Sequence, residues 1–230
     1  MNTPIEMNPF ETDAEAYDRW FEQYDAAYQS ELAAIRAALK MFAPCRRGVD
    51  IGAGTGRFTA PLGIVDGIEP AAAMRELAAR RGVKLTNGVA ENLPYQDNIF
   101  DFVLMNTTLC FVSDPAQACR EAARILRPGG RLIAGLINRD SFLGRHYEAR
   151  RQTSRFYQHA RFFTVDDVKR MMKTAGFSSF ACVQTLFDLP ENLTAPDPVM
   201  QGCDRGGFIV LTGVKPAKNP DGSLHNPKEK

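Results

Sequence analysis

Residues 49–70 read VDIGAGTGRFTAPLGIVDGIEP and place three of the chain's eighteen glycines within five positions. These are Gly52, Gly54 and Gly56. They follow a short apolar run, as the first strand-to-helix turn of an α/β sheet does. Glycine lets the backbone approach a ligand closely, so this turn is a candidate nucleotide site. Asp50 precedes the turn, and Glu69 ends the next apolar run.

The spacing of these residues narrows the kind of ligand. The glycines form G-x-G-x-G, not the dinucleotide fingerprint G-x-G-x-x-G, and no P-loop Lys-Ser/Thr pair follows. A carboxylate at Asp50 suits an ammonium group better than a pyrophosphate. Glu69, at a strand end, can accept both ribose hydroxyls of a nucleoside. Together these features predict a ligand with an ammonium, a ribose and no phosphate between them, whereas the glycines alone also fit a turn that binds nothing.

Apolar runs and helical patterns alternate on both sides of this turn. We expect strands at 46–51, 64–70, 83–88, 100–108, 131–138, 177–188 and 206–214, with helices at 71–81, 115–126 and 164–175. Alternating strands and helices predict a Rossmann-like, doubly wound α/β fold with a seven-stranded, mainly parallel sheet. No helix separates the last two strands, so one should be an antiparallel edge strand.

The chain divides into three parts by composition and spacing. Residues 1–44 are helical, with aromatic residues at helical spacing that favour core packing. They are Tyr17, Trp20, Phe21, Tyr24 and Tyr28. Residues 45–215 form the core, in which the long connection at about 139–163 predicts a cap over the carboxyl edge of the sheet. Residues 216–230 are polar and rich in Pro, Asn and Lys, which predicts a disordered tail.

Composition excludes several function classes. The formal net charge is +1, which gives no global reason for a nucleic-acid or membrane partner. The five cysteines include no C-x-x-C pair, so we expect reduced thiols in a cytoplasmic protein rather than a zinc site or disulfides. No apolar run approaches the roughly 18 residues that a membrane span needs.

On these motifs the chain resembles the class I S-adenosylmethionine (SAM)-dependent methyltransferases. The resemblance is greatest to the small-molecule branch (methyltransferase type 11) that is related to the ubiquinone and menaquinone biosynthesis enzymes. Four motifs carry it in order: VDIGAGTGRFT at 49–59, GIEPAAAM at 67–74, NGVAENLPYQDNIFDFVLMN at 87–106 and EAARILRPGGRLIAGL at 121–136. Four ordered motifs are far more specific than any one of them.

The resemblance implies SAM as the cofactor and an N-terminal lid over it. The implied cofactor-binding residues are Asp50, Gly52, Ala53, Gly54, Gly56, Glu69, Pro70, Ala90, Glu91 and Asn106. Two features depart from the family: Val89 stands where an Asp often contacts adenine, and RFTAPLG at 57–63 leaves little room for the first helix.

The residues on the acceptor side are less defined, because methyl transfer rests mainly on alignment and needs no triad or metal. Candidate bases are His146, Tyr157 and His159, and candidate substrate or lid residues are Tyr17, Trp20, Tyr24, Thr107, Arg150 and Arg151. The arginine-rich segment 139–161 fits either an anion-binding cap or the solvated face of a helix. Cys110 fits a thiol acceptor less well than a small buried hydrophobe.

The leading hypothesis is a SAM-dependent methyltransferase acting on a small molecule, with an anionic acceptor as one option. A catalytically silent SAM-binding partner protein and an NAD-dependent oxidoreductase remain as alternatives. A nucleic-acid methyltransferase is disfavoured by the neutral charge balance and by the lack of an N-P-P-Y-type tetrapeptide. The acceptor, its methylated atom and the choice between monomer and homodimer stay open.

Overall fold

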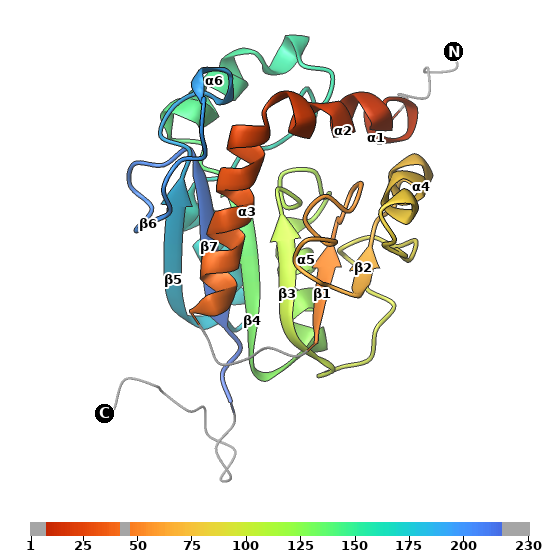
Figure 1. Cartoon of the computed structure of the whole chain (residues 1–230). Helices are drawn as coiled ribbons and strands as arrows, with labels where there is room; N and C mark the ends of the chain where they lie inside the picture. Colours follow the sequence, from red (N-terminus) through yellow and green to blue (C-terminus); the bar gives the residue numbers. More distant parts are fainter. Residues whose placement is uncertain (1–7, 42–46, 218–230) are drawn as a thin grey trace, which may run out of the picture.

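The computed structural model describes residues 8–41 and 47–217, and most of the expected disordered tail therefore lies outside the described residues. A seven-stranded sheet forms the centre of the fold, with the strand order β2-β1-β3-β4-β7-β5-β6 (Figure 1). The strands are β1 Gly48–Ile51, β2 Asp66–Ile68, β3 Phe100–Asn106, β4 Leu126–Ile137, β5 Ser178–Thr185, β6 Met200–Gln201 and β7 Phe208–Val214.

The strand directions confirm the expected fold class. Strands β2, β1, β3 and β4 are mutually parallel, and β6 pairs antiparallel with β5 at the edge of the sheet. The other antiparallel strand, β7, lies in the interior between β4 and β5. Its residues Phe208 to Gly213 are all buried, as a strand covered on both faces requires.

The expected strand at 83–88 is not formed. The sheet still has seven strands because a short strand, β6, forms elsewhere in the chain. Residues 83–88 make only an isolated bridge, between Thr86 and Ile68. Val83 is the only buried residue of this segment, so little apolar surface holds it against the sheet. The seventh strand is β6 instead, whose two exposed residues carry no hydrophobic pattern.

Helices cover both faces of the sheet, as Figure 1 shows. Helix α3 (Asp25–Lys40) packs on one face, and α5 (Pro115–Ile125) and α7 (Val165–Thr174) pack on the other. Side chains cap the starts of two of these helices: the Asp114 carboxylate accepts from the Gln117 N–H at the start of α5, and Thr164 and Asp167 form a capping box on α7. Helix α4 (Ala72–Arg80) follows β2.

The sheet separates two apolar cores. Side chains of β1, β3 and β4, among them Phe100 and Leu126, pack against α5 and α7 on one side. On the other side Leu104, Ile133 and Phe208 pack against α3. Because both faces are buried, the edge formed by the carboxyl ends of the parallel strands is the place left for a ligand.

Short helices lie across this carboxyl edge (Figure 1). They are α1 (Pro9–Thr12), α2 (Ala14–Gln23) and α6 (Phe142–Ala149), the last followed by a single 3₁₀ turn at Arg151–Thr153. The expected aromatic helix is therefore broken at Tyr24, between α2 and α3. Phe21 and Tyr28 meet edge-on across the break, with ring centroids 5.5 Å apart. After β1, residues 53–63 form turns in place of a helix, as the short sequence there requires.

Candidate active site

A cavity of about 200 Å³ lies beside the glycine turn, at the carboxyl edge of the sheet. Seven of the ten expected cofactor residues line it: Gly52, Gly54, Glu69, Pro70, Ala90, Glu91 and Asn106. Asp50 and Ala53 line a small cavity next to it, which also borders Gly52, Gly54 and Asn106. Gly56 lines neither; a Cβ there would lie 3.3 Å from Ala78, so this glycine serves the packing of the turn on α4.

The glycine turn has a backbone that L-residues rarely adopt. Gly52 and Gly54 have φ angles of 71° and 56°, in the left-handed region. A Cβ on Gly52 would lie 2.5 Å from the Thr108 methyl carbon, whereas a Cβ on Gly54 would meet nothing closer than a Tyr17 ring carbon at 4.0 Å. Gly52 therefore permits close packing on β3, and Gly54 leaves the backbone open toward the cavity.

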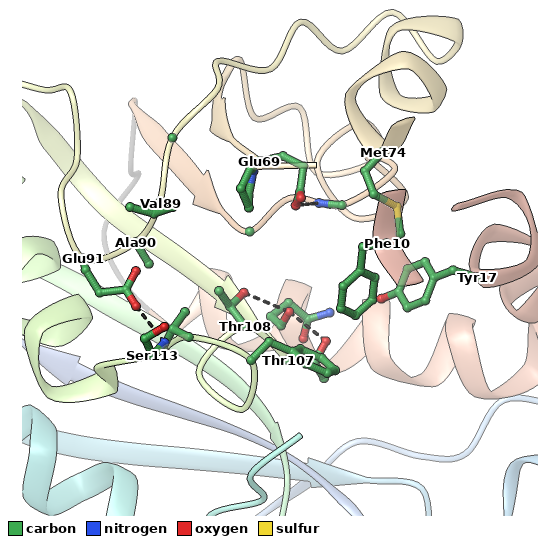
Figure 2. Close-up of a pocket in the computed structure, with 17 residues that line it drawn as sticks. Phe10, Tyr17, Glu69, Met74, Val89, Ala90, Glu91, Thr107, Thr108 and Ser113 are labelled. Atoms are coloured by element: carbon green, nitrogen blue, oxygen red, sulfur yellow. Dashed lines mark hydrogen bonds between the residues drawn. The ribbon is translucent and has the colours of Figure 1, made fainter. Parts of the chain in front are cut away.

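Glu69 projects into the cavity from the end of β2 (Figure 2). Its two carboxylate oxygens each accept one backbone N–H, from Gly54 at 2.9 Å and from Ala71 at 2.9 Å. Burial raises the pKa of Glu69, and these hydrogen bonds oppose the rise. Since each carboxylate oxygen has two lone pairs, the fixed carboxylate can still accept from a ligand.

Two buried oxygens near the turn lack a hydrogen-bond partner within the described residues, Oδ1 of Asp50 and Oδ1 of Asn106. Asp50 is 1% exposed, and its other oxygen accepts from the Thr59 hydroxyl at 2.7 Å. Burial raises the pKa of Asp50 to about 7. Unpaired buried acceptors are costly, so this end of the site favours a ligand that brings donors, as an ammonium group does.

The end of the cavity away from the N-terminal helices combines apolar side chains with one carboxylate. Figure 2 shows Val89, Ala90 and Glu91 at the end opposite Phe10 and Tyr17. The Glu91 carboxylate accepts the backbone N–H groups of Ser113 at 2.8 Å and Asp114 at 3.1 Å, so it fixes the start of α5. Val112 lines the cavity as well, whereas Met74 lies beside Phe10 in Figure 2, and the ring centroid of Phe111 is 5.0 Å from that of Phe10. Sequence reasoning missed these four residues, because isolated apolar residues on distant elements give no signal of their own.

The N-terminal helices are attached to the cofactor side by ion pairs and caps. The Glu11 carboxylate accepts the N–H groups of Ala72 at 2.8 Å and Ala73 at 3.1 Å, at the start of α4. Asp18 pairs with Arg57 at 2.7 Å and with Arg81 at 2.5 Å. These contacts hold Phe10 and Tyr17 as one wall of the cavity.

The Asp18 contacts predict a measurable coupling between α2 and the glycine turn. Burial alone would raise the pKa of Asp18, but hydrogen bonds from Arg57, Thr55 and Arg81 outweigh it and keep the pKa below its ordinary value. We expect Asp18→Asn to lower the free energy of unfolding by about 1 kcal/mol and to weaken cofactor binding about fivefold. Chemical denaturation and calorimetry measure both. Binding as tight as in the natural chain would show that α2 does not support the turn.

Another cavity of about 200 Å³, distinct from the small one beside Asp50 and called the second cavity from here on, shares Tyr17 and Thr107 with the first. Its walls are mostly aromatic: Trp20, Phe21, Phe58, Tyr147, Phe156 and Tyr157 all line it. Thr107, the residue after β3, stands between the two cavities with a φ angle of 50°. This strained conformation is uncommon for a branched residue and is typical of functional positions.

The expected acceptor-side residues divide into those that line the second cavity and those that do not. Tyr17, Trp20, Thr107 and Tyr157 line it, and Tyr24, His146, His159, Arg150 and Arg151 do not. His159 is exposed, and the imidazole of His146 lies 3.9 Å from the Glu191 carboxylate and 3.0 Å from Arg150. Burial raises the pKa of Tyr157 well above its ordinary value, so its phenol stays protonated at neutral pH.

None of the six arginines at 139–161 lines either of these two cavities. Arg151 pairs with Glu148 at 3.4 Å, and Arg155 pairs with Asp13 at 2.9 Å. Of the six arginines at 139–161, all but Arg151 are exposed.

Neither thiol nor metal chemistry finds support among the described residues. Burial raises the pKa of Cys110 to about 12, and its Sγ lies 3.0 Å from the Thr107 carbonyl oxygen. The half-buried thiol therefore stays protonated at neutral pH. Residues 8–41 and 47–217 hold no group of three His, Cys, Asp or Glu side chains arranged for a metal, and their helices are too short or too polar to cross a membrane.

Comparisons with known proteins agree with this geometry. The family model for the methyltransferase domain matches residues 49–134. A crystal structure from Thermotoga maritima, named as a SAM-dependent methyltransferase and possible histamine N-methyltransferase, is 48% identical, with 90% of this chain and 98% of that one covered and a TM-score of 0.86. An uncharacterized protein of Methanocaldococcus jannaschii is 40% identical over 209 residues, which are 91% of this chain and 100% of that protein. The chain therefore belongs to the SAM-dependent methyltransferases, with S-adenosylmethionine as its cofactor.

Proposed function

We propose that this enzyme transfers the methyl group of SAM to a small molecule held in the second cavity. The observation that carries the proposal is the meeting of two cavities at Tyr17 and Thr107. One cavity has the polar groups that a nucleoside with an ammonium needs, and the other is walled by aromatic rings. A donor site and an acceptor site that share a boundary are what direct group transfer requires.

The residues of the first cavity match the parts of SAM. Asp50, Asn106 and the bare backbone at Gly52 and Gly54 suit its amino-acid end, and Glu69 suits its ribose. Val89, Ala90 and Val112 would border the adenine. The unpartnered Oδ1 atom of Asp50 supports this assignment, because the ammonium of SAM brings the donor that it lacks.

The chain's own contribution to the chemistry is alignment and the exclusion of water. When bound, SAM supplies an electrophilic methyl group with its leaving group attached. The ring of Tyr17 borders both cavities and can stabilise a sulfonium through its π face. Thr107 fixes the boundary from the sheet side. The aromatic walls keep the acceptor dry and restrict its orientation, which are the main sources of rate for an in-line displacement.

The acceptor is small and is not selected by the arginine-rich segment. Helices α2 and α6 cover the second cavity, whose volume of about 200 Å³ leaves little space for a macromolecular side chain and its backbone. Arg150 and Arg151 lie outside it, so the structure offers no support for an anionic acceptor. The Thermotoga relative is named as a possible histamine N-methyltransferase, which makes amines the first class to test.

The first test is calorimetric titration with S-adenosylhomocysteine, with NAD as the control ligand. We expect binding of S-adenosylhomocysteine in the micromolar range and none of NAD, because the turn lacks a pyrophosphate site. Formation of S-adenosylhomocysteine from SAM is then followed with histamine and other small acceptors. Failure to bind S-adenosylhomocysteine would remove the proposal, and binding without turnover of any acceptor would favour a catalytically silent SAM-binding protein.

A further inference from the structure

One buried carboxyl group in the second cavity has no role in cofactor binding. Glu31, on α3, is 6% exposed and lines this cavity. Its side chain makes no hydrogen bond or ion pair with any of residues 8–41 and 47–217. Burial raises its pKa to about 8. A glutamate is almost never this deeply buried unless it is paired, since the charged form loses its hydration.

Glu121 is a buried glutamate with a structural role, and its contacts can be compared with those of Glu31. Glu121 is 9% exposed, close to the exposure of Glu31. Its carboxylate pairs with Arg124 at 2.7 Å and accepts the N–H of Leu93 at 2.8 Å, and the hydrogen bond from Arg124 lowers its pKa. Glu31 has none of these partners, although it is equally buried. Its partner is therefore expected to come from outside the described chain.

The groups around Glu31 point to the charge of that partner. Aromatic rings of Trp20, Tyr147 and Tyr157 line the same cavity. After burial itself, the negative charge of Glu31 contributes to the raised pKa values of Tyr17, Tyr147 and Tyr157. A carboxylate within a wall of electron-rich rings attracts a cation and repels an anion.

We propose that Glu31 recognises the protonated amine of the acceptor, so that the substrates are small basic amines. For transfer, the ammonium first gives one proton to the Glu31 carboxylate, which frees the nitrogen lone pair to accept the methyl group; the electron pair of the broken C–S bond stays on the sulfur of S-adenosylhomocysteine. This inference rests on the proposed function and adds to it the substrate class and the residue that selects it. A bound ammonium restores the charge balance that burial removes from Glu31, and the rings pack against its carbon atoms. A carboxylate acceptor would meet Glu31 and no buried cation among the described residues that line the cavity.

Arg19 is the one side chain of the described lining that could oppose this assignment. It is the only cationic residue that lines the second cavity among residues 8–41 and 47–217. Arg19 is exposed, however, and forms no ion pair with Glu31 in this part of the chain. Its charge is mostly screened by water, so the buried carboxylate dominates selection inside the cavity.

The test compares amines with uncharged molecules of the same shape. The probes are 2-phenylethylamine, tryptamine and 1,4-diaminobutane, with 2-phenylethanol, tryptophol and 1,4-butanediol as their alcohols and 3-phenylpropanoate as an anion. Turnover is measured as S-adenosylhomocysteine formed, and binding to the S-adenosylhomocysteine complex is measured by calorimetry. We expect at least one amine to bind and react, with its alcohol and the anion about 100-fold weaker.

The variant Glu31→Gln keeps the shape of the side chain and removes its charge. We expect its kcat/KM on the amine to fall about 100-fold, whereas its affinity for S-adenosylhomocysteine stays within about twofold. Glu148→Gln, which removes an exposed carboxylate on α6, is the matched control and should leave both unchanged. Equal amine turnover by Glu31→Gln, or preference for an alcohol or the anion, would overturn the inference, and so would binding of none of the amines. If the natural chain does not bind S-adenosylhomocysteine, that result would instead contradict the proposed function.

Discussion

We expect Glu69→Ala to bind S-adenosylhomocysteine about 100-fold more weakly than the natural chain. The carboxylate lies at the end of β2 and is 7% exposed, so water cannot replace it as an acceptor for the ribose hydroxyls. Hydrogen bonds to a charged group contribute about 1.5–3 kcal/mol each, and the ligand loses two of them. The backbone N–H of Gly54 also loses its partner, which loosens the turn that holds the amino-acid end.

Calorimetric titration measures this effect, and thermal unfolding checks that the variant is folded. Glu76→Ala is the matched control, because Glu76 is an exposed glutamate on α4. It should bind S-adenosylhomocysteine as the natural chain does. If Glu69→Ala binds with unchanged affinity while the variant stays folded, the ribose lies elsewhere and the assignment of the whole first cavity has to be revised.

The cofactor side was predictable from sequence because its signals are local. The glycines, Asp50 and Glu69 lie within one strand-turn-strand segment, and their spacing alone constrains which groups can meet. Because β1 and β2 are parallel neighbours, Glu69 at the end of β2 lies beside the turn that follows β1. There its carboxylate accepts the N–H of Gly54. Residues such as Met74 and Phe111 join the same cavity only through the tertiary fold, and no local pattern distinguishes them from ordinary core residues.

The sheet, too, was predictable from sequence only where the signal is local. The buried runs at β1, β3, β4 and β7 predicted strands correctly, because a continuous apolar segment has few other places to be buried. The position of β7 between β4 and β5 depends on pairing across more than seventy residues of sequence, which a run of apolar residues does not encode. The segment 83–88 had a strand-like composition but has only one buried residue, and it forms a single isolated bridge at Thr86 instead of a strand.

Glu31 was not predictable, and the reason is physical. It lies on α3 between residues with ordinary helical spacing, where an acid is normally solvated. Its burial depends on α6 and on the segment around Tyr157, more than one hundred residues later in the chain. The sequence of that later segment singles out its arginines as candidates for substrate binding, yet its tyrosines line the cavity.

The Glu31→Gln variant should also be more stable than the natural chain at neutral and alkaline pH. The ordinary pKa of a Glu is 4.5, and in the folded chain burial raises that of Glu31 to about 8. Below 4.5 the group is protonated in both folded and unfolded chains and contributes no difference. Between these values the unfolded chain releases the proton and the folded chain keeps it, so stability falls as pH rises, and above about 8 the full penalty applies.

The other groups facing Glu31 do not titrate in this window. Tyr17 on α2, Tyr147 on α6 and Tyr157 have pKa values raised by burial above that of an ordinary tyrosine. Asp50 does titrate near 7, but it is present in both proteins and cancels in their difference. The pH dependence of the stability difference therefore reports on Glu31 itself.

At about pH 8 we expect Glu31→Gln to have a free energy of unfolding larger by about 2–4 kcal/mol, a difference that disappears near pH 4. Thermal and chemical unfolding of both proteins across this range measure it. Parallel pH profiles would mean that Glu31 is ionised and solvated in the folded chain, which would contradict its burial. A glutamine that stabilises the fold while amine turnover falls would show that the carboxylate is kept at the expense of stability, as groups that bind a ligand often are.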